Sequence, residues 1–182
     1  MKIGIIGAGN IGGTLGRRWK AAGHEVVYGR RDAISVKQAV QGADVVLLAI
    51  PGNAVVELVR EHKADLDGAV IVDATNDFGG PSMNVWPEMS KLVPTAKLYR
   101  AFNSYGWDVC ADPELGGQQP DMFYAGPEGA SQNQVEQLIT DAGLRPIWVG
   151  GSDQVDTVDG VLRLWFNLSR HRGRRIAFKL IQ

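Results

Sequence analysis

The sequence predicts an α/β fold: a doubly wound, mostly parallel sheet with helices on both faces, followed by a long C-terminal helix. Two observations support this prediction. Short apolar runs alternate with helical patterns along the first half of the 182 residues, and these runs lack the polar alternation of strands that face water. A chain of this length is typical of one domain, so we expect residues 1–182 to fold as a single unit.

The first half supplies four strands in this interpretation. The clearest of them is apolar throughout and is stopped by Pro51 and Gly52. We expect the strands at 2–6, 25–28, 44–50 and 69–73. We expect the helices between them at about 10–22, at 35–40 and from Gly52 to about His62.

The second half is less regular. Strands are expected at 97–102, 122–125 and 146–149, and a helix at 130–142, where Gly143 ends it. The last segment, about 155–180, reads as one long helix because a series of residues recurs at spacings of three or four. The members of that series are Leu162, Trp165, Ser169, Gly173, Ile176 and Leu180.

Composition excludes several classes of protein. Lys and Arg number 19 against 20 for Asp and Glu, a net charge of -1, so charge gives no reason to expect a nucleic-acid or membrane partner. The single cysteine, Cys110, cannot form an internal disulfide or a zinc site by itself, and we expect no metal. No apolar run approaches the roughly 20 residues that span a bilayer. We therefore expect a cytoplasmic protein.

A glycine motif follows the first predicted strand. Gly7-Ala8-Gly9-Asn10-Ile11-Gly12 matches G-x-G-x-x-G and opens the first helix, which is the context that a Rossmann dinucleotide site requires. Gly7 permits the tight turn, Gly9 lets a pyrophosphate approach the backbone, and Gly12 lets the helix pack on the strand. The amides at the helix N-terminus would then face the phosphates. The alternative is a glycine-rich turn that packs without a ligand.

The end of the second strand indicates which nucleotide is bound. An acidic residue there would bind the ribose 2′-hydroxyl of NAD, but the sequence places Arg30 and Arg31 after Gly29. A guanidinium can hold a 2′-phosphate with charge-assisted hydrogen bonds, so we favour NADP(H). Two alternatives stay open: Asp32 pairs with an arginine in a solvated turn, or Asp32 is itself the ribose ligand.

Further candidates follow the third and fourth strands, because the carboxyl ends of parallel strands border the ligand crevice. Ala49, Ile50 and Pro51 are expected to line the dinucleotide there. Asn76 is a candidate for the nicotinamide carboxamide or for the neighbouring substrate pocket.

The groups that usually move a proton in dehydrogenases are missing. No tyrosine is followed by a lysine four residues later, and we expect His24, His62 and His171 to be surface residues. We therefore name no catalytic residue. This favours hydride transfer between two cofactor rings, for which the protein need only hold the rings in contact.

Together these motifs resemble the NADP oxidoreductase family that depends on the deazaflavin coenzyme F420, within the wider group that shares the N-terminal domain of 6-phosphogluconate dehydrogenase. The resemblance covers nearly the whole chain. The segments that carry it are Ile6–Gly12, Gly23–Val27, Arg30–Arg31, Ala49–Pro51, Asp73–Asn76, Ala101–Asn103 and the ending from Leu164 to Leu180.

The resemblance implies a role for several residues. Gly9, Asn10 and Ile11 would cradle the pyrophosphate. Arg30 would bind the 2′-phosphate, and Asn103 would face the flavin-like ring. It also implies that the C-terminal helix packs against a second subunit, which makes a homodimer. The chain departs from the family pattern at Gly29, where members often have serine.

The sequence thus predicts an NADP(H)-dependent oxidoreductase that passes hydride to coenzyme F420, a flavin or a similar acceptor. One alternative is a non-catalytic NADP(H) sensor, and another is a reductase of a small imine or carbonyl. The C-terminal segment from Gly160 carries basic residues and no acid, so it could attract a polyanionic acceptor or be a solvated helix face. Its basic residues are Arg163, Arg170, Arg172, Arg174, Arg175 and Lys179.

Overall fold

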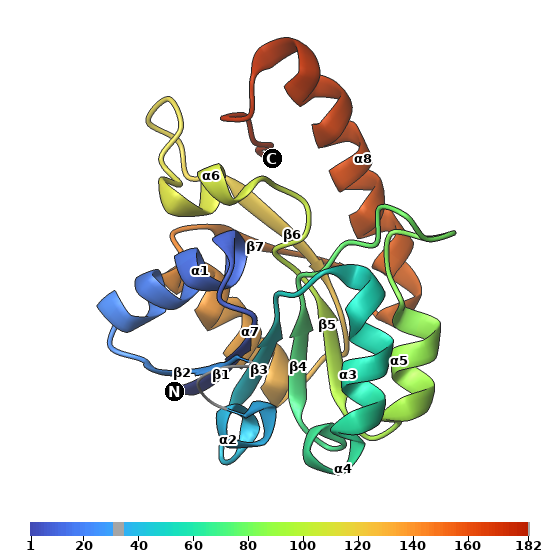
Figure 1. Ribbon diagram of the computed structural model, residues 1–182. Helices are drawn as coiled ribbons and strands as arrows, with labels where there is room; N and C mark the ends of the chain where they lie inside the picture. Colours follow the sequence, from blue (N-terminus) through green and yellow to red (C-terminus); the bar gives the residue numbers. More distant parts are fainter. Residues whose placement is uncertain (31–34, 182) are drawn as a thin grey trace.

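A computed structural model describes residues 1–30 and 35–181, and in this part of the chain the strands form a seven-stranded sheet of order β2-β1-β3-β4-β5-β6-β7 (Figure 1). The strands are β1 (Lys2–Ile6), β2 (Glu25–Gly29), β3 (Val45–Leu48), β4 (Val70–Asp73), β5 (Lys97–Arg100), β6 (Asp121–Ala125) and β7 (Arg145–Gly150). The neighbours from β2 to β5 pair in parallel, β5 and β6 pair antiparallel, and β6 and β7 pair in parallel again. The prediction of a mostly parallel sheet is confirmed.

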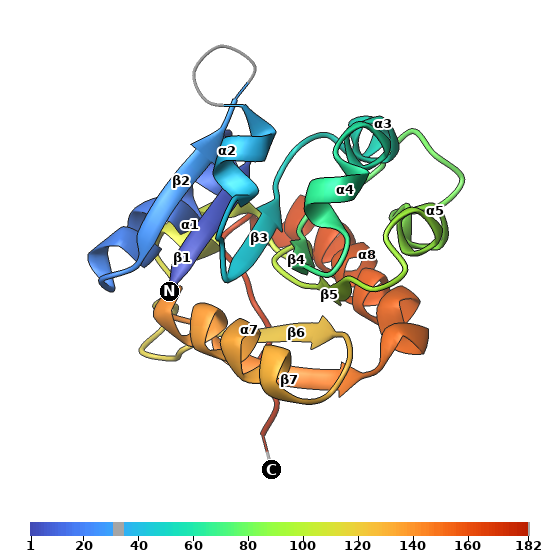
Figure 2. The same ribbon diagram turned by 90° about the horizontal axis from the view of Figure 1, so that it is seen from below.

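Helices cover both faces of this sheet, as predicted. The α-helices are α1 (Asn10–Ala21), α2 (Val36–Val40), α3 (Val55–Glu61), α4 (Lys63–Leu66), α5 (Trp86–Leu92), α6 (Trp107–Ala111), α7 (Ala130–Asp141) and α8 (Val155–Arg172), and short 3-10 turns cover Gly52–Ala54 and Ser152–Gln154. One core cluster joins buried side chains of α1, α6 and α7 to the sheet, and a second joins α2, α3, α4 and α5 to its other face. Figure 2 shows α3, α4 and α5 together on one side, away from α1.

The point where the chain changes direction across the sheet lies between β1 and β3. The chain leaves β1 for β2 on one side and returns to β3 on the other. Ile6 pairs in register with Gly29 of β2 and with Leu48 of β3, so the three strands end together. A crevice forms outside the carboxyl ends of strands at such a point, and α/β ligands bind there.

Several elements differ from the sequence prediction. The helices α5 and α6 were not predicted, although Pro87 in the first turn of α5 is a common helix-start residue. The helix expected up to about His62 consists of a 3-10 turn and α3, and the short α4, which was not predicted, follows after His62 leaves the helical conformation with φ -106° and ψ 22°. No helix within residues 1–30 and 35–181 is long and apolar enough to cross a membrane.

The long C-terminal helix is confirmed, but it ends at Arg172 and not near residue 180. Gly173 stops it with a φ of 80°, a conformation that glycine adopts without strain. The chain then turns back: the carbonyl of Ile176 accepts from Trp165 Nε1 at 2.9 Å, and the carbonyl of Phe178 accepts from the amide of Asp121 at 3.0 Å. Apolar residues beyond Gly173 therefore reach the core without a helix, which spacing alone did not reveal.

Candidate functional site

Two of the three motif glycines are required by close packing after β1. Gly7 has a φ of 101°, and a Cβ there would lie 2.3 Å from the carbonyl oxygen of Ala49. A Cβ on Gly12 would lie 2.0 Å from the carbonyl oxygen of Gly7. Both distances are far below van der Waals contact, so the turn and the first helix can approach this closely only with glycine at both positions.

The third glycine meets no such constraint. A Cβ on Gly9 would have no heavy atom within 4 Å. Gly9 is the N-cap of α1, and its carbonyl accepts the first helical hydrogen bond, from Gly13, at 2.8 Å. The amides of Asn10 and Ile11 lie before that bond and point out of the helix end. The protein's own packing thus gives no reason for glycine at position 9, whereas a ligand lying against the backbone would.

The larger of two cavities on this edge has a volume of about 770 Å³. It runs from the β1 turn, past the ends of β2 and β3, to α3. Its lining residues are Ile6, Gly7, Ala8, Gly29, Arg30, Ser35, Val36, Ile50, Pro51, Ala54, Glu57, Leu58, Glu61 and His62. The structure thus brings five of the predicted site residues, Gly7, Gly29, Arg30, Ile50 and Pro51, around one space. Arg31 lies outside the described residues.

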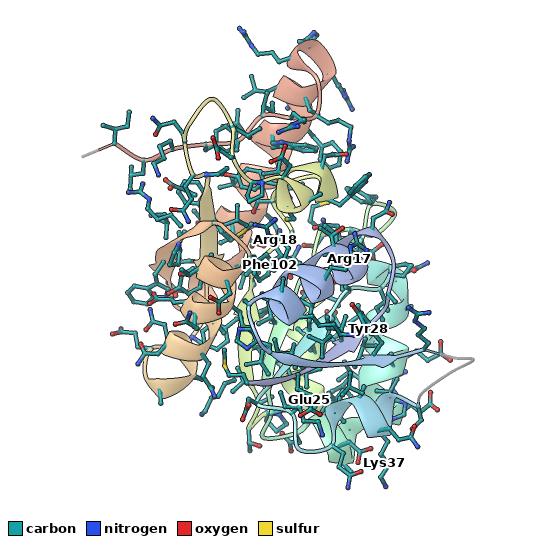
Figure 3. All side chains as sticks on the ribbon, turned by 90° about the vertical axis from the view of Figure 1, so that its left-hand side faces the viewer. Arg17, Arg18, Glu25, Tyr28, Lys37 and Phe102 are labelled. Atoms are coloured by element: carbon teal, nitrogen blue, oxygen red, sulfur yellow. The ribbon has the colours of Figure 1, made fainter. Side chains whose placement is uncertain are left out.

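Arg30 stands at the mouth of this cavity. Its guanidinium lies 5.5 Å from the ring centroid of Tyr28, a cation–π distance. Tyr28, labelled in Figure 3, extends from β2 and packs against α1. The packing is close, because a Cβ on Gly16 of α1 would lie 2.1 Å from the hydroxyl oxygen of Tyr28. Tyr28 thereby supports the guanidinium from the protein side while leaving Arg30 exposed.

Gly29, where the family resemblance implies serine, also lies in close packing. It is buried, and a Cβ there would lie 3.3 Å from both the Cβ of Ala39 and the Cα of Val36. A serine would have to push α2 outward. The hydroxyl that this cavity does contain comes from Ser35, the N-cap of α2, whose oxygen accepts from the amide of Gln38 at 3.3 Å.

A smaller cavity of about 400 Å³ adjoins the larger one at Pro51, which lines both. Its other lining residues are Gly52, Asn53, Asn76, Asp77, Phe78, Gly79 and Gly80. The two cavities lie on one edge of the sheet, side by side across the carboxyl ends of β1, β2, β3 and β4. Such an arrangement suits an elongated ligand with a distinct group at each end.

A buried charged network supports the smaller cavity. Arg100, at the end of β5, donates to Asp73 Oδ2 at 2.9 Å and to Asp159 Oδ1 at 2.8 and 2.9 Å. The side chains of all three are at most 1% exposed. Asn84 Nδ2 donates to Asp159 Oδ2 at 2.7 Å. The network therefore joins β4, β5 and α8 to the loop that follows β4.

Both predicted pocket asparagines belong to this network. Asn76 accepts from Arg100 at 3.0 Å and donates to the carbonyl of Asn103 at 3.1 Å, while it also lines the smaller cavity. Asn103 is 1% exposed and directs its amide to Asp159 at 2.9 Å. Asn76 is thus placed to meet a ligand in the smaller cavity. Asn103 does not line this cavity, and its carbonyl holds the side chain of Asn76.

Sequence reasoning missed Arg100 and Asp159. The signal for Asp159 was available, because it occupies an inward position of α8 among Val155, Val158 and Leu162. A charged residue in a buried stripe needs a partner. The partner itself could not be identified, since Arg100 is 59 residues away in the sequence.

The single cysteine and the three histidines differ in their surroundings. Burial raises the pKa of the Cys110 thiol to about 12, so it is no nucleophile near neutral pH. His24 was expected at the surface, but its side chain is only 8% exposed and contacts Asp141 at 2.8 Å. His171 is exposed as expected, and His62 lines the larger cavity. Within the described ranges no cluster of metal ligands occurs.

Comparison with known proteins places these observations in a family. The model of the family described as NADP oxidoreductase, coenzyme F420-dependent, matches residues 2–37 and 30–77. These segments contain the glycine turn, Arg30 and Asn76. The match confirms the resemblance predicted from the sequence over residues 2–77 and supports an NADP-dependent oxidoreductase whose acceptor is not specified.

Solved structures share the fold. A protein from Arthrobacter sp. FB24, proposed to be an F420-dependent NADP reductase, has a TM-score of 0.87 at 22% identity, and the similarity covers 100% of both chains. A hypothetical protein from Sinorhizobium meliloti has a TM-score of 0.66 at 29% identity over 83% of this chain and 85% of its own. An imine reductase from Streptomyces aurantiacus has a TM-score of 0.64 at 17% identity, over 92% of this chain but 60% of its own.

Proposed function

We propose that this chain, which matches the family of coenzyme F420-dependent NADP oxidoreductases over residues 2–77, transfers hydride between NADP(H) and a deazaflavin, a flavin or a similar acceptor. In this proposal the diphosphate lies against Gly9 and the first turn of α1. The adenosine and its 2′-phosphate occupy the larger cavity, where Arg30 binds the phosphate. The nicotinamide occupies the smaller cavity beside Asn76. The single observation that carries the proposal is that two cavities adjoin at Pro51 along the carboxyl ends of the strands, the larger of them lined by Gly7 and Ala8 of the glycine turn.

The protein's part in the reaction is positioning. NADPH, when bound, supplies a hydride, and a flavin-like acceptor then needs only one further proton, which solvent can supply. The described residues that line the smaller cavity include no histidine, lysine, tyrosine or cysteine, and Asp77 supplies their one carboxyl group. A reaction that needs no protein-borne acid therefore fits this site better than one that protonates an alkoxide.

We also propose that the protein acts as a homodimer through α8. The support is Leu164, which is 51% exposed on a helix whose other apolar side chains are largely covered. Reduction of a small imine is the second candidate, favoured by the shared fold with the imine reductase. The present chain matches only 60% of that protein's length, so a pocket of that kind would need residues from a second subunit.

The Arg30→Ala substitution tests the nucleotide assignment. Loss of a charge-assisted phosphate contact should weaken NADPH binding roughly 10- to 100-fold, whereas NADH binding should hardly change. Isothermal titration calorimetry with both nucleotides measures this. Arg60→Ala is the matched control, because Arg60 is exposed on α3 and does not line the larger cavity. Equal affinity of the wild type for NADPH and NADH would contradict the 2′-phosphate site, and no binding of either would refute the whole proposal.

A turnover screen separates the enzyme from the sensor. NADPH oxidation is followed at saturating nucleotide with 5-deazariboflavin, FMN and the small imine 1-pyrroline in turn. Turnover with a flavin-like ring supports the proposed reaction, and turnover with 1-pyrroline alone supports imine reduction. Tight NADPH binding without turnover on any of them supports the sensor.

A further inference from the structure

An exposed aromatic ring stands at the rim of the smaller cavity. Phe78 is 64% exposed and lines that cavity. A large apolar side chain left open to water beside a cavity is stabilised when a ligand covers it, because its apolar surface leaves water. The packing of the fold leaves most of this ring uncovered, and the nucleotide site proposed above assigns it no role.

The surroundings hold Phe78 in place without covering it. Its ring meets Phe166 of α8 edge to face, with centroids 5.4 Å apart and planes at 84°, and Phe166 meets Trp165 in the same manner at 5.4 Å. Trp165 is 1% exposed, so this row of rings connects the rim to the core. The amide of Asp77, which precedes Phe78, donates to the carbonyl of Met83 at 2.9 Å and closes the loop.

The loop beyond Phe78 leaves room for a flat ligand. Gly79 and Gly80 follow, and a Cβ on Gly79 would have no heavy atom within 4 Å. A Cβ on Gly80 would lie 2.4 Å from the carboxylate of Asp77, so that side chain would have to turn away to admit one. The part of the wall that follows the ring, at Gly79 and Gly80, is therefore backbone, which leaves space for a planar ligand beside Phe78.

We propose that Phe78 is the outer wall of the acceptor site and that it selects acceptors with a planar aromatic ring system by stacking on them. The inference rests on the proposed function, since it requires the nicotinamide to lie in the smaller cavity. Hydride transfer between two rings requires them to lie face to face in contact. An aromatic side chain on the open side of the acceptor would hold it there, whereas a small imine or carbonyl offers no face for stacking.

The test measures acceptor binding with Phe78→Ala, Phe78→Leu and Phe78→Trp variants. Riboflavin and 5-deazariboflavin are titrated into protein saturated with NADP+, which cannot reduce them, and binding is followed by calorimetry. Phe78→Ala should weaken the binding of both probes about tenfold. Phe78→Leu should show most of this loss because it keeps apolar area but not the ring, and Phe78→Trp should keep wild-type affinity.

Trp107→Ala is the matched control. Trp107 is a second exposed aromatic, 39% exposed, that lines neither cavity. Its replacement should leave the affinity for both probes unchanged, and every variant should bind NADPH like the wild type. In turnover, Phe78→Ala should raise KM for 5-deazariboflavin about tenfold and leave KM for 1-pyrroline unchanged.

Three results would overturn the inference. The first is unchanged probe affinity in Phe78→Ala, and the second is an equal loss in Trp107→Ala. The third is a change of oligomeric mass in Phe78→Ala by sedimentation, which would assign the ring to a subunit interface. If wild-type protein does not bind NADP+ at all, the proposed function itself fails. If it binds NADP+ but neither probe, only the assignment of Phe78 and its acceptor class fails.

Discussion

The two ends of the crevice are built in opposite ways. At the end that we assign to the phosphates, the parts proposed to face the ligand are backbone amides that follow Gly9 and one exposed guanidinium, Arg30, all within the first 30 residues. At the nicotinamide end, the cavity wall is held by Arg100 and Asp159, which are buried and 59 residues apart. The first end depends on local chain geometry, and the second depends on tertiary structure.

This difference separates binding from stability. A residue such as Arg30 can be replaced without disturbing the core, because it is exposed and its guanidinium lies over the face of Tyr28. A residue such as Asp159 cannot, because its carboxylate is the common acceptor for Arg100, Asn84 and Asn103. Substitutions at the phosphate end should therefore change affinity, and those at the nicotinamide end should change the free energy of unfolding.

The largest expected effect is on stability at the nicotinamide end. In the wild type, both carboxylate oxygens of Asp159 accept hydrogen bonds, one from Arg100 and the other from Asn84. In an Asp159→Asn variant, the new side-chain NH2 group would therefore face one of these donors in either orientation of the amide. Breaking a buried charge pair costs about 3–5 kcal/mol. We expect Asp159→Asn to lose about 3 kcal/mol of unfolding free energy, measured from urea unfolding curves.

Asp156→Asn provides the control within the same helix. Asp156 also accepts from Asn84 Nδ2, at 3.2 Å, but it is exposed. Its substitution should cost less than about 0.5 kcal/mol. A similar loss in both variants would show that the network contributes no more than a surface hydrogen bond, and the contrast between the two ends would then be wrong.

At the phosphate end we expect an effect on affinity without one on stability. In a Gly9→Ala variant the new methyl group meets no protein atom within 4 Å, but it would occupy the space of the pyrophosphate. NADPH affinity should fall about tenfold or more, by calorimetry, with unchanged urea unfolding. Gly160→Ala is the control: Gly160 is likewise without a heavy atom within 4 Å, lies in α8, and should leave NADPH affinity unchanged. Unaltered NADPH binding in Gly9→Ala would place the diphosphate elsewhere.

The same contrast explains what the sequence could predict. The turn from Gly7 to Gly12 and the cation at Arg30 follow from local spacing, because a strand, a glycine motif and a helix are consecutive. The role of Asn103 could not be derived in this way. Its amide is turned inward after Phe102, a buried residue held at a φ of 61°, and neither this backbone conformation nor the distant Asp159 is encoded in local pattern. The end of α8 was predicted wrongly for a related reason. Ile176 and Phe178 are apolar because they pack against the core after the helix has ended, and their spacing only resembles that of a helix face.

The smallest expected effect concerns the segment after α8. Asp121 is buried at the start of β6, which opposes its ionisation, but hydrogen bonds from Arg145 at 2.6 and 2.7 Å and from the amide of Leu180 hold the pKa of this carboxyl below its ordinary value. A carboxyl whose pKa is lowered by folding stabilises the protein above the unfolded-state pKa of about 4. That contribution is lost as the pH falls through the lower, folded-state pKa.

We therefore expect acid to release residues 174–181 while the phosphate end is unaffected. Hydrogen exchange at pH 7 should show protection at the amides of Phe178 and Leu180, whose partners are the Tyr105 hydroxyl and the Asp121 carboxylate. An Asp121→Asn variant should lose this protection at pH 7, and its stability should vary less with pH below about 4. Asp67→Asn is the control, because hydrogen bonds from Thr95 also lower the pKa of that carboxyl, but it lies far in sequence from the tail and makes no contact with it. Equal loss of protection at Phe178 in both variants would mean that general destabilisation, and not the Asp121 contacts, governs the C-terminal segment.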